Sequence, residues 1–325
     1  MGTRRNPRHG TMQFWPRKRS DKPYASVNSW AVAKDVTPLA FAGYKVGMTH
    51  IMLDDKRPNS MTKGEKISWP VTILECPPLT VHSARFYKNT PYGRKVITEV
   101  LNSKPKKHVA RKVVIPKSVK QNFDNLPNFD DVTMLVHTNP DLTGIGKKKP
   151  DIFEVAIGGT KDEKLNYLKQ NLGKDFAIQD VFKEGALIDV HAISKGHGYC
   201  GVVKKYGVAI RSHKSEKTKR GCIQGPQGYD KVLTTVPKSG KIGYHMRTNY
   251  NQVILKIDSD ATKVNPVDGF GHYGIVKNQY ILVKGSVIGV KKRLAILCRA
   301  IRPNQKKTIG ASTVSWISTQ SKQGR

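Results

Sequence analysis

The stretches LAFAGYKVGMTHIML (residues 39–53) and SWPVTILECPPLTVHSARFYK (residues 68–88) decide how this chain folds. Each consists of short runs of strand-forming residues interrupted by Gly or Pro, which is typical of an all-β barrel or sandwich and not of alternating strands and helices. Similar runs return along the chain, and the sequence therefore predicts a mainly β protein. These further strand-like runs are DDVTMLVHTNP (130–140), IFEVAIGG (152–159), ALIDVHAIS (186–194), GYCGVVKKY (198–206), NQVILKI (251–257), HYGIVKNQYILVKGSVIGV (272–290) and RLAILCRAI (293–301).

The clearest helical signal lies within residues 160–184. Thr160 followed three residues later by Glu163 is a capping-box pattern at a helix start. The helix-spaced leucines and the glycine placed to end the helix are Leu165, Leu168, Leu172 and Gly173. Residues 151–190 hold eight acids against five lysines, so we expect this part to pack on the protein's own body and not on phosphates.

The charge of the whole chain points to a polyanionic partner. The 325 residues include 57 lysines and arginines but 24 acids, a formal net charge of +33. Self-repulsion on this scale makes nucleic acid the strongest candidate partner. The sequence shows no apolar run long enough to cross a bilayer, no secretion signal and no basic amphipathic helix for a membrane surface. We therefore expect a cytoplasmic protein without a membrane partner.

Two segments concentrate the positive charge. Residues 1–22 carry seven lysines and arginines against one acid, with no helical or strand periodicity, which predicts an extended arm that becomes ordered on a partner. Phe14 and Trp15 lie among these cations, an arrangement that suits stacking on unpaired bases; the alternative is a solubilising tail. Residues 88–120 contain ten lysines and arginines and one acid, Glu99.

The stretch SKGHGYCGVVKKYGVAIRS (194–212) has glycines in a G-x-G-x-x-G register at Gly196, Gly198 and Gly201. A dinucleotide site needs a helix after the glycines and an acid about twenty residues later. VVKKYG leaves no room for a helix, and the chain near residue 220 reads TKRGC. A kinase loop is excluded because VAIR follows too closely and neither H-R-D nor D-F-G occurs.

We instead interpret these glycines as conformational devices. Gly196 and Gly198 permit a turn or bulge, and Gly201 permits a close approach of two backbones. The neighbouring cations then face the phosphates of a nucleic-acid backbone and not those of a cofactor.

Enzyme chemistry has no support in the sequence. The cysteines Cys76, Cys200, Cys222 and Cys298 are widely spaced, which predicts buried thiols and neither a disulfide framework nor a zinc ribbon. His197 and His213 with two of these cysteines fit no standard zinc spacing. No H-E-x-x-H, G-x-S-x-G or P-loop motif occurs, and the histidines are scattered singly. We expect no catalytic residues, no metal, no cofactor and no small-molecule substrate.

Five motifs give a resemblance to a known family. The motifs are PRHGTMQFWPRKR (7–19), FAGYKVGMTHI (41–51), ISKGHGYCGVVKKYG (193–207), SGKIGYHMRTNYN (239–251) and GFGHYGIVKNQYILVKGSVIG (269–289). In this order, they are similar to segments of the universal large-subunit ribosomal protein L-three family, archaeal and eukaryotic type, and the similarity runs from the arm to about residue 303.

The resemblance implies a mainly β fold with an α+β insertion: a six-stranded β-barrel of the translation-protein type with a mixed α/β inserted domain, an extended N-terminal arm and a long basic internal loop. The expected division is an arm at 1–37, the first part of the barrel at 38–87, the inserted region at 88–185, the second part of the barrel at 186–303 with the loop at 204–250, and a basic tail at 304–325.

The resemblance also implies a function. Such a protein is a structural constituent of the large ribosomal subunit that binds near the 3′ end of the 23S-type rRNA and nucleates subunit assembly. Its loop reaches toward the peptidyl-transferase centre, and its neighbours are ribosomal proteins L-fourteen and L-twenty-four-e. Members of this type usually carry tryptophan at the loop tip, whereas CIQGPQGYDKVLTTVPKSG (222–240) places Gln227 there, so we expect polar tip contacts. The length and charge suggest an archaeal source.

The candidate rRNA-binding residues are the cations, histidines, glutamines and aromatic residues of the arm and the loop. In the arm they are Arg4, Arg5, Arg8, His9, Trp15, Arg17, Lys18 and Arg19. In the loop they are Lys195, His197, Lys204, Lys205, Arg211, His213, Lys214, Lys217, Lys219, Arg220, Gln224, Gln227, Lys238, Lys241, Tyr244, His245 and Arg247. The alternative is a DNA-binding chromatin or architectural protein, although no helix-turn-helix, zinc finger or basic zipper is visible.

Overall fold

The computed structural model describes residues 12–57, 60–118, 122–123, 125–216, 232–304 and 314–320. The chain forms two compact units. The smaller unit comprises residues 1–22 and 193–246, and the larger unit comprises residues 23–192 and 247–325. Strands dominate the regular structure of the described residues, so the prediction of a mainly β protein is confirmed.

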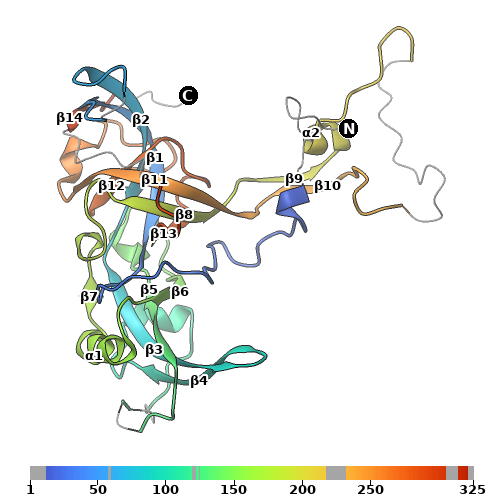
Figure 1. The fold of residues 1–325 in the computed structure, drawn as a ribbon. Coiled ribbons are helices and arrows are strands. Elements are labelled where there is room, and N and C mark those ends of the chain that lie inside the picture. Colours follow the sequence, from blue (N-terminus) through green and yellow to red (C-terminus); the bar gives the residue numbers. More distant parts are fainter. Residues whose placement is uncertain are drawn as a thin grey trace. The chain divides into compact units, whose positions relative to one another are not determined.

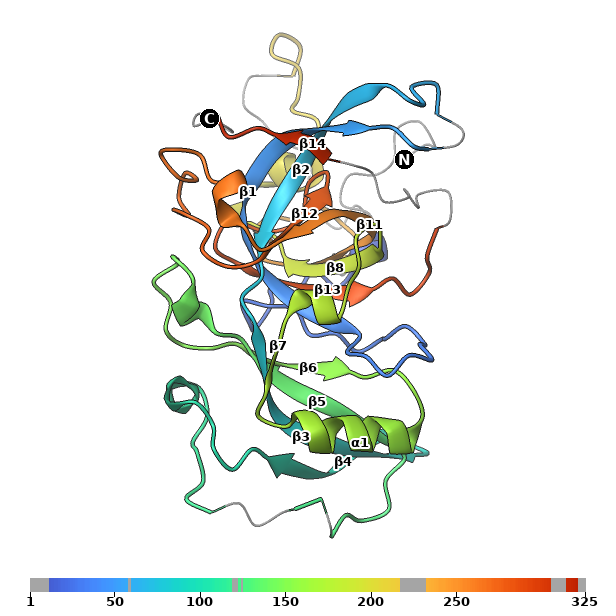
Figure 2. The same ribbon diagram turned by 90° about the vertical axis from the view of Figure 1, so that its left-hand side faces the viewer.

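The first sheet of the larger unit is organised by its longest strand, β1 (Ala40–Asp54), which pairs antiparallel with β2 (Lys66–Glu75) (Figures 1 and 2). The strand order is β13-β8-β11-β12-β2-β1-β14, and β13 also pairs with β1. Six of these strands therefore have a hydrogen-bonded neighbour on both sides. The other members are β8 (Leu187–Ile193), β11 (Met246–Asp258), β12 (Tyr280–Lys284), β13 (Leu294–Arg299) and β14 (Val314–Ile317).

The second sheet of the larger unit has the order β4-β3-β5-β6, and the short strand β7 pairs with β3. The helix α1 lies along this sheet (Figure 2). The elements are β3 (Leu79–Thr90), β4 (Gly93–Leu101), β5 (Asp131–His137), β6 (Ile152–Ala156), β7 (Asp175–Phe176) and α1 (Lys161–Asn171). Single 3-10 turns occur at Met12–Phe14, Lys107–Arg111, Pro140–Leu142, Ile178–Asp180 and Ala261–Lys263.

One continuous apolar core joins the two sheets of the larger unit. Phe41 of β1 packs edge-on against Phe176 of β7, with 5.6 Å between the ring centroids, a geometry that aromatic pairs favour. The buried hydroxyl of Tyr44 donates to Thr138 Oγ1 at 3.1 Å, so the polar end of this core tyrosine is paired. Burial of apolar side chains from both sheets is the main stabilising term of this unit.

The predicted helix is confirmed. α1 starts after Thr160, whose backbone N–H donates to Glu163 Oε2 at 2.8 Å. It ends before Gly173, which has φ of +81°, the left-handed conformation that commonly terminates helices. Leu168 is fully buried, as the leucine spacing predicts.

Three expectations about local structure are wrong: one strand over 198–206, no helix within VVKKYG (202–207), and one strand over 272–290. GYCGVVKKY (198–206) is not one strand, because β9 ends at Cys200 and a one-turn helix, α2 (Val202–Tyr206), follows it. Gly201 and Gly207 flank this turn, and Gly207 is left-handed with φ of +65°, so two glycines delimit a helix too short to show periodicity. The strand predicted at 272–290 is limited to Tyr280–Lys284, because its flanks turn at His272 and Gly285, which both have positive φ.

The second part of the expected arm, residues 23–37, packs on the larger unit. Tyr24 and Ala25 are buried, and the Tyr24 hydroxyl donates to the Ile152 carbonyl at 2.8 Å. Trp30 and Val36 also pack on the core of the larger unit. These ordered residues lie outside residues 1–22, the segment for which order on a partner is expected.

A buried carboxylate holds the connection between β11 and β12. Glu75 is fully buried at the end of β2 and accepts hydrogen bonds from the backbone N–H groups of Lys277 (2.9 Å) and Asn278 (3.0 Å). The Asn278 side-chain amide donates at 2.8 Å and the Tyr273 hydroxyl also donates. These donors satisfy the charge inside the protein and fix an otherwise irregular loop.

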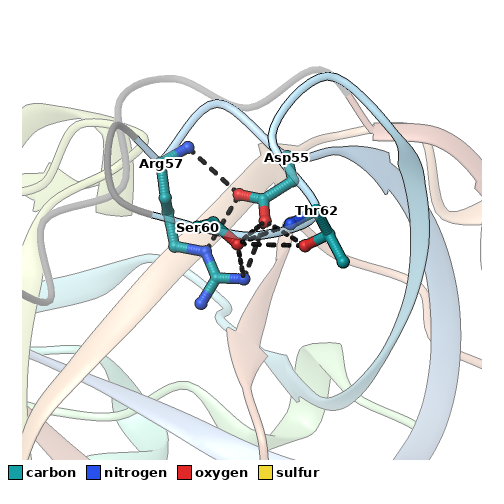
Figure 3. Close-up of polar contacts among 4 residues, drawn as sticks. All are labelled: Asp55, Arg57, Ser60 and Thr62. Atoms are coloured by element: carbon teal, nitrogen blue, oxygen red, sulfur yellow. Dashed lines mark hydrogen bonds and ion pairs between the residues drawn. The ribbon is translucent and has the colours of Figure 1, made fainter.

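A second carboxylate orders the connection from β1 to β2 (Figure 3). Asp55 accepts from the Arg57 guanidinium at 2.9 and 2.7 Å, from Ser60 Oγ at 2.6 Å and from Thr62 Oγ1 at 2.7 Å. The Arg57 guanidinium and the two hydroxyls hold the pKa of Asp55 well below its usual range. Asp55 therefore stays ionised and keeps this connection folded on itself.

We predict that Glu75→Ala lowers the free energy of unfolding by about 3 kcal/mol, because several buried donors lose their acceptor together. Urea unfolding of the full chain measures this loss. Glu65→Ala removes an exposed carboxylate and is the matched control, with an expected change below about 0.5 kcal/mol. Equal midpoints for the two variants would contradict the role of Glu75.

Stability should also depend on His137, whose pKa is lowered to about 4 by burial and by the neighbouring His108, His82 and Lys106. The unfolded chain binds this proton near pH 6.5, so it holds more protons than the folded chain between pH 6.5 and 4. We predict that His137 causes a loss of about 2 kcal/mol of stability as the pH falls from 7 to 4.5.

The measurement compares urea unfolding of the wild-type chain and His137→Phe at pH 7 and pH 4.5. The variant should lose less stability on acidification, whereas the exposed His213→Gln should behave like the wild type. If His137→Phe lost as much unfolding free energy between pH 7 and pH 4.5 as the wild type, other groups would be the cause of the acid dependence.

Candidate nucleic-acid interface

The smaller unit is built on a two-stranded hairpin. β9 (Gly196–Cys200) pairs antiparallel with β10 (Gly240–Gly243), and the register shifts between Lys241 and Gly243. α2 follows β9 directly and places Lys204 on its exposed side. Residues 12–22 of the arm belong to the same unit, so both predicted RNA-binding segments contribute to it.

The side chain of His245 ties the arm to the hairpin. The Gly243 N–H donates to His245 Nε2 at 3.2 Å, so this nitrogen is the acceptor of the neutral ring. Nδ1 therefore carries the hydrogen and donates to the Lys18 carbonyl at 2.9 Å. The ring is only 7% exposed, and both nitrogens bond within the protein. His245 was predicted to bind rRNA; its geometry instead suits positioning of the arm.

Backbone hydrogen bonds complete this junction. The Ser20 N–H donates to the Tyr244 carbonyl at 2.9 Å, and the Tyr244 N–H donates to the Lys195 carbonyl at 3.0 Å. Ser194 exchanges two bonds with His245, one through its backbone N–H and one through its hydroxyl. The arm is thereby attached as an additional segment beside the hairpin.

The close backbone approach occurs at a different glycine from the one predicted. A Cβ on Gly201 would meet nothing within 4 Å, so the prediction for Gly201 is wrong. A Cβ on Gly243 would lie 2.0 Å from the Lys195 carbonyl oxygen, and φ of Gly243 is +82°. Gly198 has φ of +65°, which confirms its conformational role.

The charge of the smaller unit is strongly one-sided. Its described residues include eleven lysines and arginines but two acids, Asp21 and Glu216. Asp21 lies 3.7 Å from the exposed Lys18 ammonium, and Glu216 accepts from the Ser212 backbone. Two carboxylates cannot neutralise eleven cations, so this surface attracts a polyanion.

Aromatic rings are interleaved with these cations. The Arg17 guanidinium lies over the Tyr206 ring at 4.8 Å, and the Lys205 ammonium lies 5.3 Å from the same ring centroid. The Tyr206 ring thus contacts one cation of the arm and one of α2 through cation–π interactions. Phe14 is 51% exposed and Tyr199 is 73% exposed, so both offer stacking faces. Tyr199 and Tyr206 are absent from the predicted set, although their position among lysines and glycines was a usable signal.

The other predicted residues fall into three groups. Lys18, Arg19, Lys195, His197, Lys204, His213, Lys214, Lys238 and Lys241 are exposed. Trp15, Arg17, Lys205, Arg211, Tyr244 and Arg247 are half-buried, and Arg247 belongs to the larger unit. Outside the described residues lie Arg4, Arg5, Arg8, His9, Lys217, Lys219, Arg220, Gln224 and Gln227.

Other kinds of site receive no support from the geometry. Cys76, Cys200 and Cys298 are buried free thiols, as predicted, and Cys222 is outside the described residues. Within the described ranges, no group of three His, Cys, Asp or Glu side chains is arranged to hold a metal ion. The same part of the chain has no helix that is long and apolar enough to cross a membrane. Fold and surface together define a β-rich protein with one strongly cationic unit.

Comparison with known proteins gives the family. The family model described as Ribosomal protein L3 matches residues 1–324, so the chain belongs to this family and the match continues beyond residue 303. The large ribosomal subunit protein uL3 of Methanothermobacter thermautotrophicus is 42% identical and aligns over 100% of both chains. Those of Methanobrevibacter smithii (42%) and Methanocaldococcus jannaschii (41%) align over 98% of both chains.

Family membership confirms several predictions. The chain is a structural constituent of the large ribosomal subunit and not an enzyme, with rRNA and ribosomal proteins as its partners. Its place is on cytoplasmic ribosomes. The relatives named above are archaeal, which agrees with the expected archaeal type.

We predict that Gly243→Ala opens the junction between hairpin and arm, because a left-handed alanine costs about 1–2 kcal/mol and its Cβ would also clash with the Lys195 carbonyl. Hydrogen–deuterium exchange at the Ser20 and Tyr244 amides should accelerate about tenfold or more. Gly201→Ala is the control and should leave both amides protected. Unchanged exchange in Gly243→Ala would contradict this account of the junction.

Proposed function

We propose that the smaller unit is the principal rRNA-binding element of this ribosomal protein. The proposal rests mainly on charge: the described residues of this unit include eleven lysines and arginines but only two acids. Exposed aromatic rings lie among these cations. Phosphate contacts supply most of the affinity, and each contact contributes about −0.7 to −0.9 to the slope of log K against log salt. The predicted arm and loop residues that are exposed there are the proposed contacts.

The proposal extends to the place and role of binding. The chain binds near the 3′ end of the 23S-type rRNA and nucleates assembly of the large subunit. The loop that contains Gln227, which lies outside the described residues, reaches toward the peptidyl-transferase centre. Ribosomal proteins L-fourteen and L-twenty-four-e are the proposed neighbours. These points rest on the family to which the chain belongs.

The proposal also covers the organisation of the larger unit. The six strands with neighbours on both sides are proposed to be the translation-protein-type barrel, in two parts at 38–87 and 186–303 with the loop at 204–250. The sheet of β4, β3, β5 and β6 is proposed to contain most of the inserted α/β region expected at 88–185, although its strand β3 already begins at Leu79, within the first barrel range. Residues 1–37 are the proposed arm and residues 304–325 the basic tail.

The alternative of a DNA-binding chromatin protein is disfavoured by the family. Charge alone does not separate RNA from DNA, because both present the same phosphate backbone. The test must therefore compare both nucleic acids at the same salt concentration.

The experiment measures binding of the full chain to the 3′-terminal and 5′-terminal thirds of protein-free large-subunit rRNA, with duplex DNA as competitor. We expect the 3′ segment to bind at least tenfold more tightly than the 5′ segment and to resist DNA competition. Replacing Lys195, Lys204 and Lys241 by Gln should reduce the magnitude of the salt slope by about two to three.

The matched control replaces Lys169, Lys174 and Lys183 by Gln. These lysines are equally exposed but lie in the acid-rich segment of the larger unit, so the slope should not change. Equal slopes for the two triple variants, or equal binding of DNA and rRNA, would contradict the proposed function.

A further inference from the structure

The hairpin of β3 and β4 in the larger unit carries a second basic surface. β5 pairs with β3 only from Thr80 to Tyr87, so the hairpin continues beyond its sheet with residues 88–95 (Figure 1). Pro91 and Tyr92 form the turn between Thr90 and Gly93. The Thr90 hydroxyl donates to the Gly93 carbonyl at 2.7 Å, and Gly93 has φ of +120°, so the turn is tight and locally braced.

Two lysines face each other across this hairpin. Lys88 and Lys95 are direct partners in the β3–β4 ladder, and both are exposed. Side chains of directly opposite residues lie on the same face, about 5 Å apart at Cβ, where like charges repel. Among the described residues, neither ammonium has an ion-pair or hydrogen-bond partner. An anion bound between them would turn this repulsion into attraction.

The nearest cation on the hairpin is already paired. Arg94 forms an ion pair with Asp131 at 2.8 Å and lies over the Tyr87 ring at 4.3 Å. Two acids lie beside the hairpin: Asp131 is bound to Arg94 and also to Lys164, and Asp130 accepts a hydrogen bond from the Asn89 backbone N–H at 2.7 Å. Lys88 and Lys95 are left to an external partner.

The tip of the hairpin presents an aromatic ring. Tyr92 is fully exposed, at 101% of its reference area, and Val96 is 42% exposed. A tyrosine without contacts in its own protein offers both faces of its ring, and bases stack on such rings without sequence preference. Lys88, Lys95 and Tyr92 all lie within residues 88–95 of one hairpin. A short single-stranded RNA segment could therefore contact the ring with a base and the lysines with its phosphates.

We propose that this hairpin is a second RNA-binding site, at which Lys88 and Lys95 bind phosphate oxygens and Tyr92 stacks on an unpaired base. The inference rests on the proposed rRNA binding and adds a contact in the larger unit. An RNA strand fits better than an acidic protein, because the basic character continues through residues 88–120, which contain ten lysines and arginines and one acid. An extended run of this kind follows a phosphate backbone.

The test uses the full chain and protein-free large-subunit rRNA. Replacing Lys88 and Lys95 together by Gln should reduce the magnitude of the salt slope by about one and a half, the value for two phosphate contacts. Tyr92→Ala should weaken binding about fivefold or more without a change of slope, whereas Tyr92→Phe should bind like the wild type. Lys169 and Lys174 replaced together by Gln are the control and should change neither quantity. Urea midpoints equal to that of the wild type confirm that the variants fold.

The outcomes separate this inference from the proposed function. If the hairpin variants bind like the wild type while the variant of Lys195, Lys204 and Lys241 loses slope, the inference is wrong and the proposed function stands. If neither set changes binding, the proposed function fails as well. If the hairpin variants lose a ribosomal protein from reconstituted subunits but keep their rRNA affinity, the hairpin binds protein and the inference is overturned.

Discussion

Mutual repulsion of the positive charges is the constraint on which the rest of the structure depends. With 57 cations and 24 acids, the chain has few carboxylates with which to fold. The larger unit places several of them inside, where Glu75, Asp55 and Asp189 accept hydrogen bonds from backbone or side-chain donors. Even if every acid paired with one cation, an excess of 33 positive charges would remain. The unneutralised surface cations are available to bind phosphates. The same distribution of charge therefore stabilises the fold through its buried acids and favours RNA binding through its exposed cations.

Attachment of the arm to the hairpin explains how cations distant in sequence can act together. His245 bonds to Gly243 and to Lys18 through its two ring nitrogens, so a neutral side chain, and not an acid, makes this connection. An ion pair at the same place would remove positive charge from the surface. Arg17 and Lys205 can then lie against one tyrosine ring, a convergence that local sequence alone does not create.

Features with strong local patterns could be predicted from the sequence. The strand β1 lies within residues 39–53 apart from its last residue, and α1 follows the predicted cap and leucine spacing. α2 could not be predicted, because five residues between two glycines show no periodicity. The close approach at Gly243 depends on Lys195, which is distant in the chain, so the motif pointed to Gly201 instead. For the candidate site, the sequence charge singled out the arm and the loop as the basic segments. Only the fold shows which of their side chains are exposed, like Lys195, and which are buried, like His245.

The central claim, that the smaller unit contacts rRNA, is tested most directly by the reactivity of lysines toward acetylation in intact large subunits and in the free full-length protein. The account predicts that Lys195, Lys204 and Lys241 are protected in the subunit and regain reactivity after nuclease digestion. Lys169, Lys174 and Lys183 in the acid-rich segment should show no nuclease-dependent change. Equal reactivity of the first three lysines in subunits and free protein, or protection that survives digestion of the RNA, would contradict the claim.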